Sequence, residues 1–417
     1  MFYKYYNKNK IINSAIYFFV FILVVLFYYK LHFESFIPIT GDELNSVLVY
    51  SSNIKTLFLK NFPGNTTFFH SFGYIKTLLF DYDLITYRSI TFIFFLLQFF
   101  FLAKYGFEYN KIIFISLLLI SSNYTLYVGA YVGYVFSSLI YLIIIILLNK
   151  DDEKNYNKVI LFLLFVLFYN HLVNLYFVIP ILVSLFFTSK KLKFINNFLI
   201  YFLLPSCLFY MISTILTGVS LLKVKTTNLD FILNFIFSNF AEIFTSGFER
   251  IFFYEAYANA SSFKITQLLS DIFYYDKLFL FFFLFSIISA FLNLKYKYYN
   301  IKFTYIIFFH FFIFFLINKQ PAPRIFSGFY IIYVLIFIFT FRHKHFEKLN
   351  KNKIIGSILS VILFLKVVTI DYKQIANNGF LSDITYKENN YSLYLLKKKC
   401  KLVNIKFSEI QKRNFYF

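Results

Sequence analysis

Long apolar segments alternate with short polar ones along most of this 417-residue chain. A helix that crosses a bilayer needs about 20 predominantly apolar residues. By that measure the pattern predicts eleven spanning helices, at 11–29, 84–103, 112–129, 131–148, 159–170, 171–188, 195–216, 278–294, 303–318, 325–341 and 354–370. The predicted fold class is therefore an all-α membrane protein with about eleven transmembrane helices.

The stretch 159–188 needs a separate argument, because it is too long for one upright span and short for two. Asn170, His171 and Asn174 lie in its middle. Polar groups are costly in hydrocarbon unless they reach water or protein. We therefore predict two short helices that meet at a turn near Asn170.

The basic residues favour the same division. With the N-terminus in the cytoplasm, the predicted inside loops all carry lysine or arginine, at 104–111, 149–158, 189–194, 295–302 and 342–353. The outside turns at 122–133 and near residue 170 carry neither. Cytoplasmic loops are enriched in these residues. Treating 159–188 as one span would place the basic loop 342–353 outside.

This topology gives a multi-pass protein, which we assign to a bacterial inner membrane with a cytoplasmic N-terminus and an extracytoplasmic C-terminus. Residues 1–370 form one transmembrane domain with outside loops at 30–83 and 217–277, and residues 371–417 form a small extracytoplasmic tail. In the first loop, helical apolar spacing at 43–60 and 66–80 predicts helices lying in the interface. The second places these residues on one side: Phe68, Phe69, Phe72, Ile75 and Leu79.

Composition excludes several classes of protein. Hydrophobic residues make up 59% of the chain and charged residues 15%, against about 25% charged in a soluble domain. This excludes disorder and disfavours a soluble globule. Two cysteines exclude a disulfide scaffold or Cys-rich metal site. We interpret the net charge of +21 as basic loops facing anionic lipid rather than nucleic acid. The phenylalanine run 280–285 is interpreted as lipid-facing.

Acidic residues are scarce, and Asp42 and Glu43 stand together on the outer side after the first predicted span. One hypothesis makes them a general base for an acceptor hydroxyl or a metal ligand. The alternative is structural: Asp42 caps the following helix and Glu43 occupies its first turn, where the helix dipole favours a negative charge. The local sequence alone favours the cap.

Three cations lie at predicted outer helix mouths. Arg88 opens the second span, and its guanidinium suits a phosphate, although it could instead snorkel to the interface or pair with Asp81 or Asp83. Lys319 and Arg324 flank a Pro-x-Pro turn in a short outside loop. They depart from the positive-inside trend. A phosphate at the outer leaflet, or an ion pair with a loop carboxylate, would explain them.

Histidines and Tyr87 are weaker candidates. His70 lies in the first outside loop and Tyr87 at the outer start of the second span, and both are candidates, with His171, to line a site. A lone histidine such as His171 in an apolar stretch is more often structural than a ligand. His310 falls in the middle of a span, where we expect a packing or hydrogen-bonding role. The sequence contains no HExxH motif, P-loop or Gly-rich dinucleotide turn.

Taken in order, these motifs resemble the GT-C class of multispanning glycosyltransferases, which includes protein O-mannosyltransferases and bacterial aminoarabinose transferases. The resemblance is carried, over roughly 10–220 and more weakly 300–340, by Gly41-Asp42-Glu43, Asn61-Phe62-Pro63-Gly64, Phe68 to Phe80, Tyr87-Arg88-Ser89, Tyr169-Asn170-His171 and Pro323-Arg324-Ile325-Phe326. Pro63 is followed by Gly64, where the family often has a His-Pro-Pro-like run. The turn 121–133 lacks the acidic motif of the metal-dependent branch.

The resemblance implies a polyprenyl-phosphate-linked sugar donor, a lipid or glycan acceptor and transfer at the outer face of the membrane. It makes Asp42 the general base, assisted by Glu43, and Arg88, Lys319 and Arg324 the donor-phosphate ligands. Direct displacement would invert the anomeric centre. No cofactor is expected, and a divalent metal requirement stays open. Nucleic acid is not an expected partner.

Three alternatives stay open. One is a purely structural membrane subunit, and the placement of Asp42, Arg88 and Arg324 on the outer face speaks weakly against it. A Wzy-type polymerase or O-antigen ligase relies chiefly on Arg and His in large loops, yet loop 217–277 has only Arg250 and no histidine. A transporter or flippase of lipid-linked sugars should show hydropathy repeats and charges within its spans, which the sequence largely lacks. The identities of the sugar and the acceptor do not follow from the sequence.

Overall fold

The computed structural model describes residues 54–57, 67–79, 84–104, 133–149, 153–171, 174–217, 277–297, 300–316 and 328–340, with isolated positions at 18–29, 46, 51 and 358–365. Every regular element in this described part is helical. The all-α prediction is therefore confirmed for these residues. The predicted span 112–129 and the tail 371–417 lie outside them, and the spans 11–29 and 354–370 are described only at scattered helical positions.

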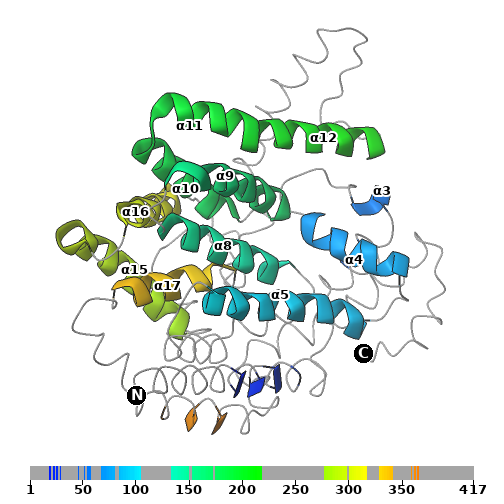
Figure 1. Cartoon of the computed structure of the whole chain (residues 1–417), viewed down its shortest axis with the longest axis horizontal. Coiled ribbons are helices and arrows are strands. Elements are labelled where there is room, and N and C mark those ends of the chain that lie inside the picture. The colour runs from blue at the N-terminus through cyan, green and yellow to red at the C-terminus, as the bar shows by residue number, and fades with distance from the viewer. Residues whose placement is uncertain are drawn as a thin grey trace, which may run out of the picture.

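Figure 1 shows the helices lying side by side, with the short α3 and α4 at one end of the group. The elements are α3 (Ile54–Leu57), α4 (Thr67–Leu79), α5 (Leu84–Lys104), α8 (Tyr134–Asn149), α9 (Glu153–Asn170), α10 (Leu175–Thr188), α11 (Lys191–Phe198), the π-helical η4 (Leu199–Leu203), α12 (Leu204–Thr217), α15 (Lys277–Tyr296), α16 (Ile301–Leu316) and α17 (Tyr330–Thr340). Each predicted span between 131 and 341 therefore falls on a helix, as does 84–103.

Within the described residues, one helix is long and apolar enough to cross a membrane by length and composition, Lys191–Phe209. It is continuous through η4 and exposes large apolar side chains along one side, including Leu192, Ile195, Leu199 and Leu208. The apolar stretches of α5, α8, α9, α10, α15, α16 and α17 are shorter.

The predicted break near Asn170 is confirmed, because α9 ends at Asn170 and α10 begins at Leu175. The two helices form a hairpin. Asn157, near the start of α9, donates from Nδ2 to Ser189 Oγ, just past the end of α10, at 3.2 Å. A single bent helix would hold these residues far apart, since each residue adds about 1.5 Å along the axis.

Hydrogen bonds between distant residues define the other helix directions. Ser184, late in α10, donates to the carbonyl of Lys302, early in α16, at 3.0 Å. Asn300, just before α16, donates to the carbonyl of Leu148, late in α8, at 3.3 Å. The ends of α8 and α10 and the starts of α9 and α16 therefore lie at the same end of the bundle.

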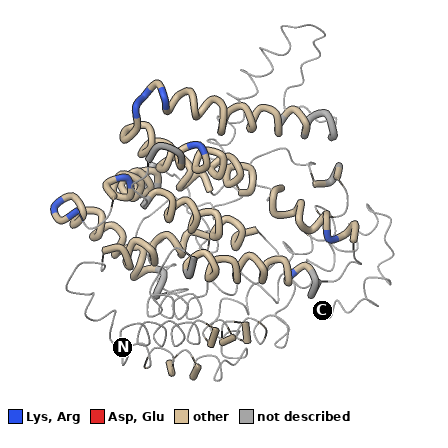
Figure 2. Tube along the Cα trace, in the orientation of Figure 1, with Lys and Arg blue, Asp and Glu red and all other residues tan. Residues whose placement is uncertain are grey.

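This end of the bundle is basic, and we call it the lysine end. It carries lysines from four elements, Lys158, Lys190, Lys191, Lys193, Lys295, Lys297 and Lys302. Figure 2 shows blue stretches on α9, α11, α15 and α16 and separate ones on α4 and α5. The described parts of the predicted inside loops 149–158, 189–194 and 295–302 thus share one end of the bundle.

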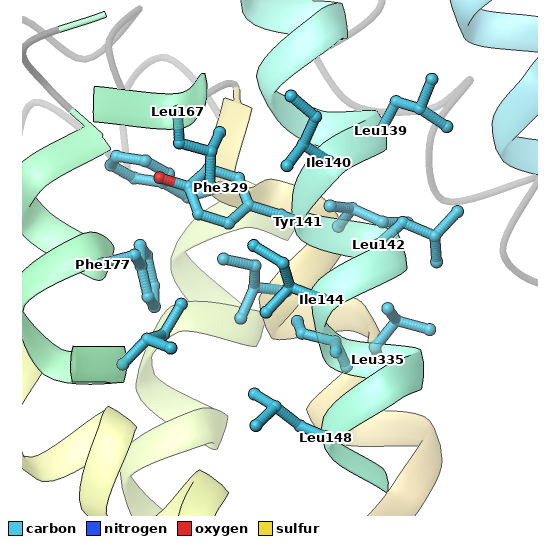
Figure 3. Close-up of a cluster of buried hydrophobic side chains, with 14 of the residues drawn as sticks. Leu139, Ile140, Tyr141, Leu142, Ile144, Leu148, Leu167, Phe177, Phe329 and Leu335 are labelled. Carbon is cyan, nitrogen blue, oxygen red and sulfur yellow. The ribbon is translucent and has the colours of Figure 1, made fainter. Parts of the chain in front are cut away.

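The core lies where α8, α10, α16 and α17 meet. Tyr141 of α8 reaches toward Phe177 of α10 and Phe329, which begins the turn into α17 (Figure 3). His310 of α16 stacks on Phe177, with ring centroids 3.8 Å apart. Its Nδ1 lies 2.7 Å from the Tyr176 carbonyl and its Nε2 lies 2.7 Å from the Tyr333 hydroxyl. Because a carbonyl only accepts, Nδ1 carries the proton and Tyr333 donates to Nε2. The predicted hydrogen-bonding role of His310 is confirmed.

The interpretation of the 280–285 phenylalanine run as lipid-facing is wrong for two residues. Phe282 and Phe283 are buried, whereas Phe281 is exposed. Phe282 packs edge-on against Phe337 of α17, and Phe283 against Phe311 of α16. A continuous run necessarily places some rings on the bundle side, because successive residues of a helix point in directions about 100° apart.

Candidate functional site

Helix α4 turns several polar residues toward the protein and several large apolar residues outward. His70 is 2% exposed and Lys76 6% exposed. By contrast, Ile75 is 52% exposed and Leu79 68% exposed. A helix on the surface of a soluble protein shows the opposite arrangement. The protein therefore encloses a polar face of α4 at the end of the bundle opposite the lysines.

The predicted apolar stripe of this helix needs one correction. Phe72, Ile75 and Leu79 do share the outer side, but Phe69 is fully buried on the inner side. Phe69 follows Phe68 by one residue and so points about 100° away from the stripe. The outer stripe still rests partly on protein, because Phe68 stacks on Phe209 of α12 and Phe72 contacts Phe94 of α5 edge-on.

Lys76 meets the start of α5 through an aromatic ring. Its Nζ lies 4.5 Å from the centroid of the Tyr87 ring, and Tyr87 is fully buried. A cation over a desolvated aromatic face is stabilised by about 2 kcal/mol. This contact joins α4 to α5 and fixes a positive charge inside the protein.

A hydroxyl pair reinforces the same junction. The Tyr87 and Thr77 hydroxyl oxygens lie 2.6 Å apart. Thr77 Oγ1 also lies 3.0 Å from the Ser51 carbonyl and 2.8 Å from the Gly73 carbonyl. Carbonyls only accept, so the Thr77 proton points toward them and Tyr87 donates to Thr77. The orientation of the Tyr87 ring is therefore set from both α4 and residue 51.

Arg88 follows Tyr87 on α5 and is 3% exposed. It therefore does not snorkel to solvent; Asp81 and Asp83, the carboxylates predicted as its possible partners, lie outside the described residues. Burying a guanidinium requires compensation by hydrogen bonds or an anion. We call His70, Lys76, Thr77, Tyr87 and Arg88 the α4–α5 site: they lie on two joined helices, and the contacts that join them are Lys76–Tyr87 and Thr77–Tyr87. It combines two buried cations with a buried histidine whose pKa is lowered by burial to about 3, so the imidazole is neutral at pH 7.

One polar group beside this site has no partner within the described part of the chain. Thr91 lies one turn beyond Arg88 on α5, is fully buried, and its hydroxyl makes no hydrogen bond there. A buried hydroxyl without a partner costs roughly 1–3 kcal/mol. Further along α5, Gln98 Oε1 accepts a hydrogen bond from the Ser138 hydroxyl of α8 at 3.3 Å.

The α9–α10 break lies at the same end of the bundle. Asn170 contacts α4 and α8 through its side chain: Oδ1 accepts from the Phe69 backbone N–H at 3.3 Å, and Nδ2 donates to Ser137 Oγ at 2.8 Å. His171 is half-buried, with its ring 5.2 Å from that of Tyr134. The backbone N–H of His171 donates to the Leu167 carbonyl at 3.2 Å.

The predicted site residues are thus only partly brought together. His70, Tyr87 and Arg88 lie on the joined helices α4 and α5, and His171 lies at the break whose neighbour Asn170 contacts α4. Asp42, Glu43, Lys319 and Arg324 lie outside the described residues.

Sequence reasoning missed Lys76 and Thr77. A usable signal existed in the spacing, because His70, Gly73, Lys76 and Thr77 recur at three- and four-residue intervals and form a polar stripe opposite the leucines. Reading only the apolar stripe of residues 66–80 hid it. Among the described residues, no group of three His, Cys, Asp or Glu could hold a metal ion.

Chemically, the α4–α5 site suits an anion. Its two cations are excluded from water, where a charge interacts more strongly than at an exposed surface. The neutral imidazole of His70 can donate or accept one hydrogen bond. Comparison with known proteins adds no assignment: no family model matches the sequence, and no curated protein or solved structure matches it.

Proposed function

We propose that this chain is a multi-pass membrane glycosyltransferase of the GT-C type, which transfers a sugar from a polyprenyl-phosphate donor to an acceptor hydroxyl at the outer face. One observation carries the proposal. Helix α4 buries Lys76 against Tyr87 of α5, next to the buried Arg88, while its leucines face outward. An amphiphilic ligand with an anionic head and an apolar tail matches such an arrangement.

The multi-pass arrangement is part of the proposal. The apolar helices run from the lysine end to the end that holds α4, and the lysines would meet the cytoplasmic headgroups. The α4–α5 site then lies on the outer side, where a lipid-linked sugar arrives already activated. The exposed Ile75, Leu78 and Leu79 would contact hydrocarbon, as in an interfacial helix.

The reaction is an in-line displacement. The acceptor oxygen forms a bond to the anomeric carbon as the bond from that carbon to the phosphate oxygen breaks. The acceptor proton passes to the Asp42 carboxylate, oriented by Glu43, and the lipid phosphate leaves with the bonding electron pair. Arg88 and Lys76, with Lys319 and Arg324, would stabilise the charge that develops on that phosphate.

The direct test is sugar transfer from radiolabelled polyprenyl-phosphate donors in membranes that carry the full chain. Wild type should transfer sugar with inversion. Arg88→Gln should lower kcat/KM roughly 100-fold, as removal of one preorganised charge-stabilising donor does. Asp42→Asn should abolish transfer. Lys191→Gln, which removes an exposed cation at the lysine end, is the matched control and should retain wild-type activity.

Each result has a stated meaning. If Arg88→Gln and Lys191→Gln lose activity equally, the α4–α5 site does not bind the donor phosphate. If Asp42→Asn stays active, Asp42 is a helix cap and the base lies elsewhere. Failure of wild type on a broad donor panel would instead favour a transporter of lipid-linked sugars, which flux measurements in proteoliposomes would detect.

A further inference from the structure

Asn170 provides an acceptor for the start of α4 from a position 101 residues away in the chain. Phe69 is the third residue of α4, and its backbone N–H donates to Asn170 Oδ1 at 3.3 Å. The first four N–H groups of an α-helix have no acceptor within the helix. Asn170 therefore acts as a cap contributed by another helix.

The orientation of the Asn170 amide is fixed. Its Nδ2 donates to the Gly133 carbonyl at 3.2 Å and to Ser137 Oγ at 2.8 Å, both at the start of α8. The carbonyl of Gly133 only accepts, so the amide cannot rotate by half a turn without losing this bond. Asn170 is fully buried, which makes an unsatisfied amide costly. Its Oδ1 is thus held toward α4.

Asn174 lies at the same helix break as Asn170, but none of its hydrogen bonds among the described residues reaches α4. Its Nδ2 donates to Ser137 Oγ at 3.0 Å and to the Leu167 carbonyl at 2.8 Å, and its Oδ1 accepts from the Tyr141 hydroxyl at 3.0 Å. These bonds reach α8 and α9. The two asparagines therefore share Ser137 and hold the same helix break, but the bond to α4 comes from Asn170.

Directional bonds and ring contacts constrain α4 differently. Phe68 packs on Phe165 and Phe209, and Phe72 packs on Phe94 and Phe136. Such contacts hold the helix sideways, yet tolerate a small slide along its axis, because dispersion is non-directional. A hydrogen bond weakens steeply with misalignment. The Asn170 bond therefore sets the axial position of the first turn of α4, and the Thr77–Tyr87 hydroxyl pair sets that of its last turns.

We infer that Asn170 is a positioning residue: it fixes α4 along its axis so that Lys76 and Thr77 keep their contacts with Tyr87 of α5. The consequence for catalysis rests on the proposed function, whereas the placement of α4 does not. Asn170 is the last residue of α9. The position of α4 is therefore coupled to that of the α9–α10 break.

The experiment measures the placement of α4 directly in the full-length protein in lipid nanodiscs. Ile75→Cys in α4 and Phe162→Cys in α9, both at exposed positions, carry the spin labels, and Cys207 and Cys400 are replaced by serine. Pulsed electron–electron double resonance then gives the distribution of distances between the two spin labels. Asn170→Ala should broaden or shift it, whereas the matched Asn174→Ala should leave it as in wild type. Ser137→Ala, a milder change that weakens both asparagines, should broaden it partly.

Transfer kinetics on the same variants separate positioning from general damage. Asn170→Ala should lower kcat about tenfold, a change of about 1.4 kcal/mol in the barrier, with an unfolding temperature close to that of Asn174→Ala. An unchanged distance distribution in Asn170→Ala and Ser137→Ala overturns the inference. So does equal broadening in Asn174→Ala. A distribution that shifts as expected in a protein that transfers no sugar supports the positioning role and rejects the proposed function.

Discussion

Lys76 and Tyr87 form a buried cation–π pair across the junction of α4 and α5, with Nζ 4.5 Å from the ring centroid. Its significance lies in where it occurs. The same type of contact joins Lys158 and Tyr201 at 5.4 Å near the lysine end, but there the lysine is exposed. Water screens an exposed charge and weakens such a pair, so the buried pair should contribute far more to stability.

Substitutions at the two tyrosines should reveal this difference. Tyr87→Phe keeps the ring under Lys76 and loses the hydroxyl bond to Thr77, which should cost about 1 kcal/mol. Tyr87→Leu also removes the aromatic face and should cost roughly 3 kcal/mol. Tyr201→Leu is the matched control and should cost clearly less than Tyr87→Leu. Chemical unfolding in detergent measures all three, and equal costs for the two leucine variants would contradict the importance of the buried pair.

The Thr91 hydroxyl should reduce stability rather than add to it. It is fully buried and makes no hydrogen bond within the described residues. Thr91→Val replaces it with a methyl of similar shape and should stabilise the protein by about 1 kcal/mol. Thr304→Val is the control, because Thr304 Oγ1 accepts from Asn293 Nδ2 at 2.8 Å, and its loss should destabilise.

Unfolding temperatures of the two variants should therefore move in opposite directions. If Thr91→Val is stabilising yet raises the KM for the lipid-linked donor, the hydroxyl is reserved for a ligand beside Arg88. A destabilised Thr91→Val would mean that the hydroxyl is satisfied in the native protein, contrary to the structure.

Sequence patterns located the helix break at Asn170 because an amide in an apolar stretch is costly without a partner. The structure supplies those partners, in Phe69, Gly133 and Ser137. Their identity could not be predicted, since Phe69 is about 100 residues distant and backbone groups leave no trace in a sequence pattern. The need for a polar contact is local, whereas its fulfilment is tertiary.

The orientation of α4 shows a second limit. Periodicity separates Phe72, Ile75 and Leu79 from His70 and Lys76, but it does not say which side meets protein. In a soluble protein the apolar side turns inward, and next to lipid it can turn outward. Sequence reasoning therefore found the helix and its outer stripe, and overlooked the cation that the inner face buries.

The stability of the protein should depend on pH through His70. Its pKa falls from 6.5 to about 3 on burial. Below pH 6.5 the unfolded chain binds a proton that the folded protein does not, so folding stability decreases as pH falls from 6.5 toward 3, and is unaffected above that range. At pH 5 the loss amounts to about 2 kcal/mol.

His70→Gln should flatten this dependence. The difference in unfolding free energy between pH 7 and pH 5 should be smaller in the variant by up to about 2 kcal/mol. His171→Gln, at a half-buried histidine near the same end, controls for loss of a histidine side chain in general. An unchanged pH dependence in His70→Gln would show that His70 is protonated or accessible in the folded protein.

The direction of the bundle in the membrane is open to a simple chemical test. The hairpin of α9 and α10 places His171 at one end and the Asn157–Ser189 contact, next to Lys190 and Lys191, at the other. Under the proposed topology, His171→Cys in a background without Cys207 and Cys400 should react with a membrane-impermeant maleimide in intact cells. Lys191→Cys should react only after the membrane is opened, because positively charged loops stay in the cytoplasm. If only Lys191→Cys is labelled in intact cells, the topology is the reverse of the proposed one. The α4–α5 site would then lie on the cytoplasmic side. Nucleotide-activated sugars are available there, so a lipid-linked donor would no longer be required. Labelling of both positions in intact cells would mean that the α9–α10 hairpin does not cross the membrane.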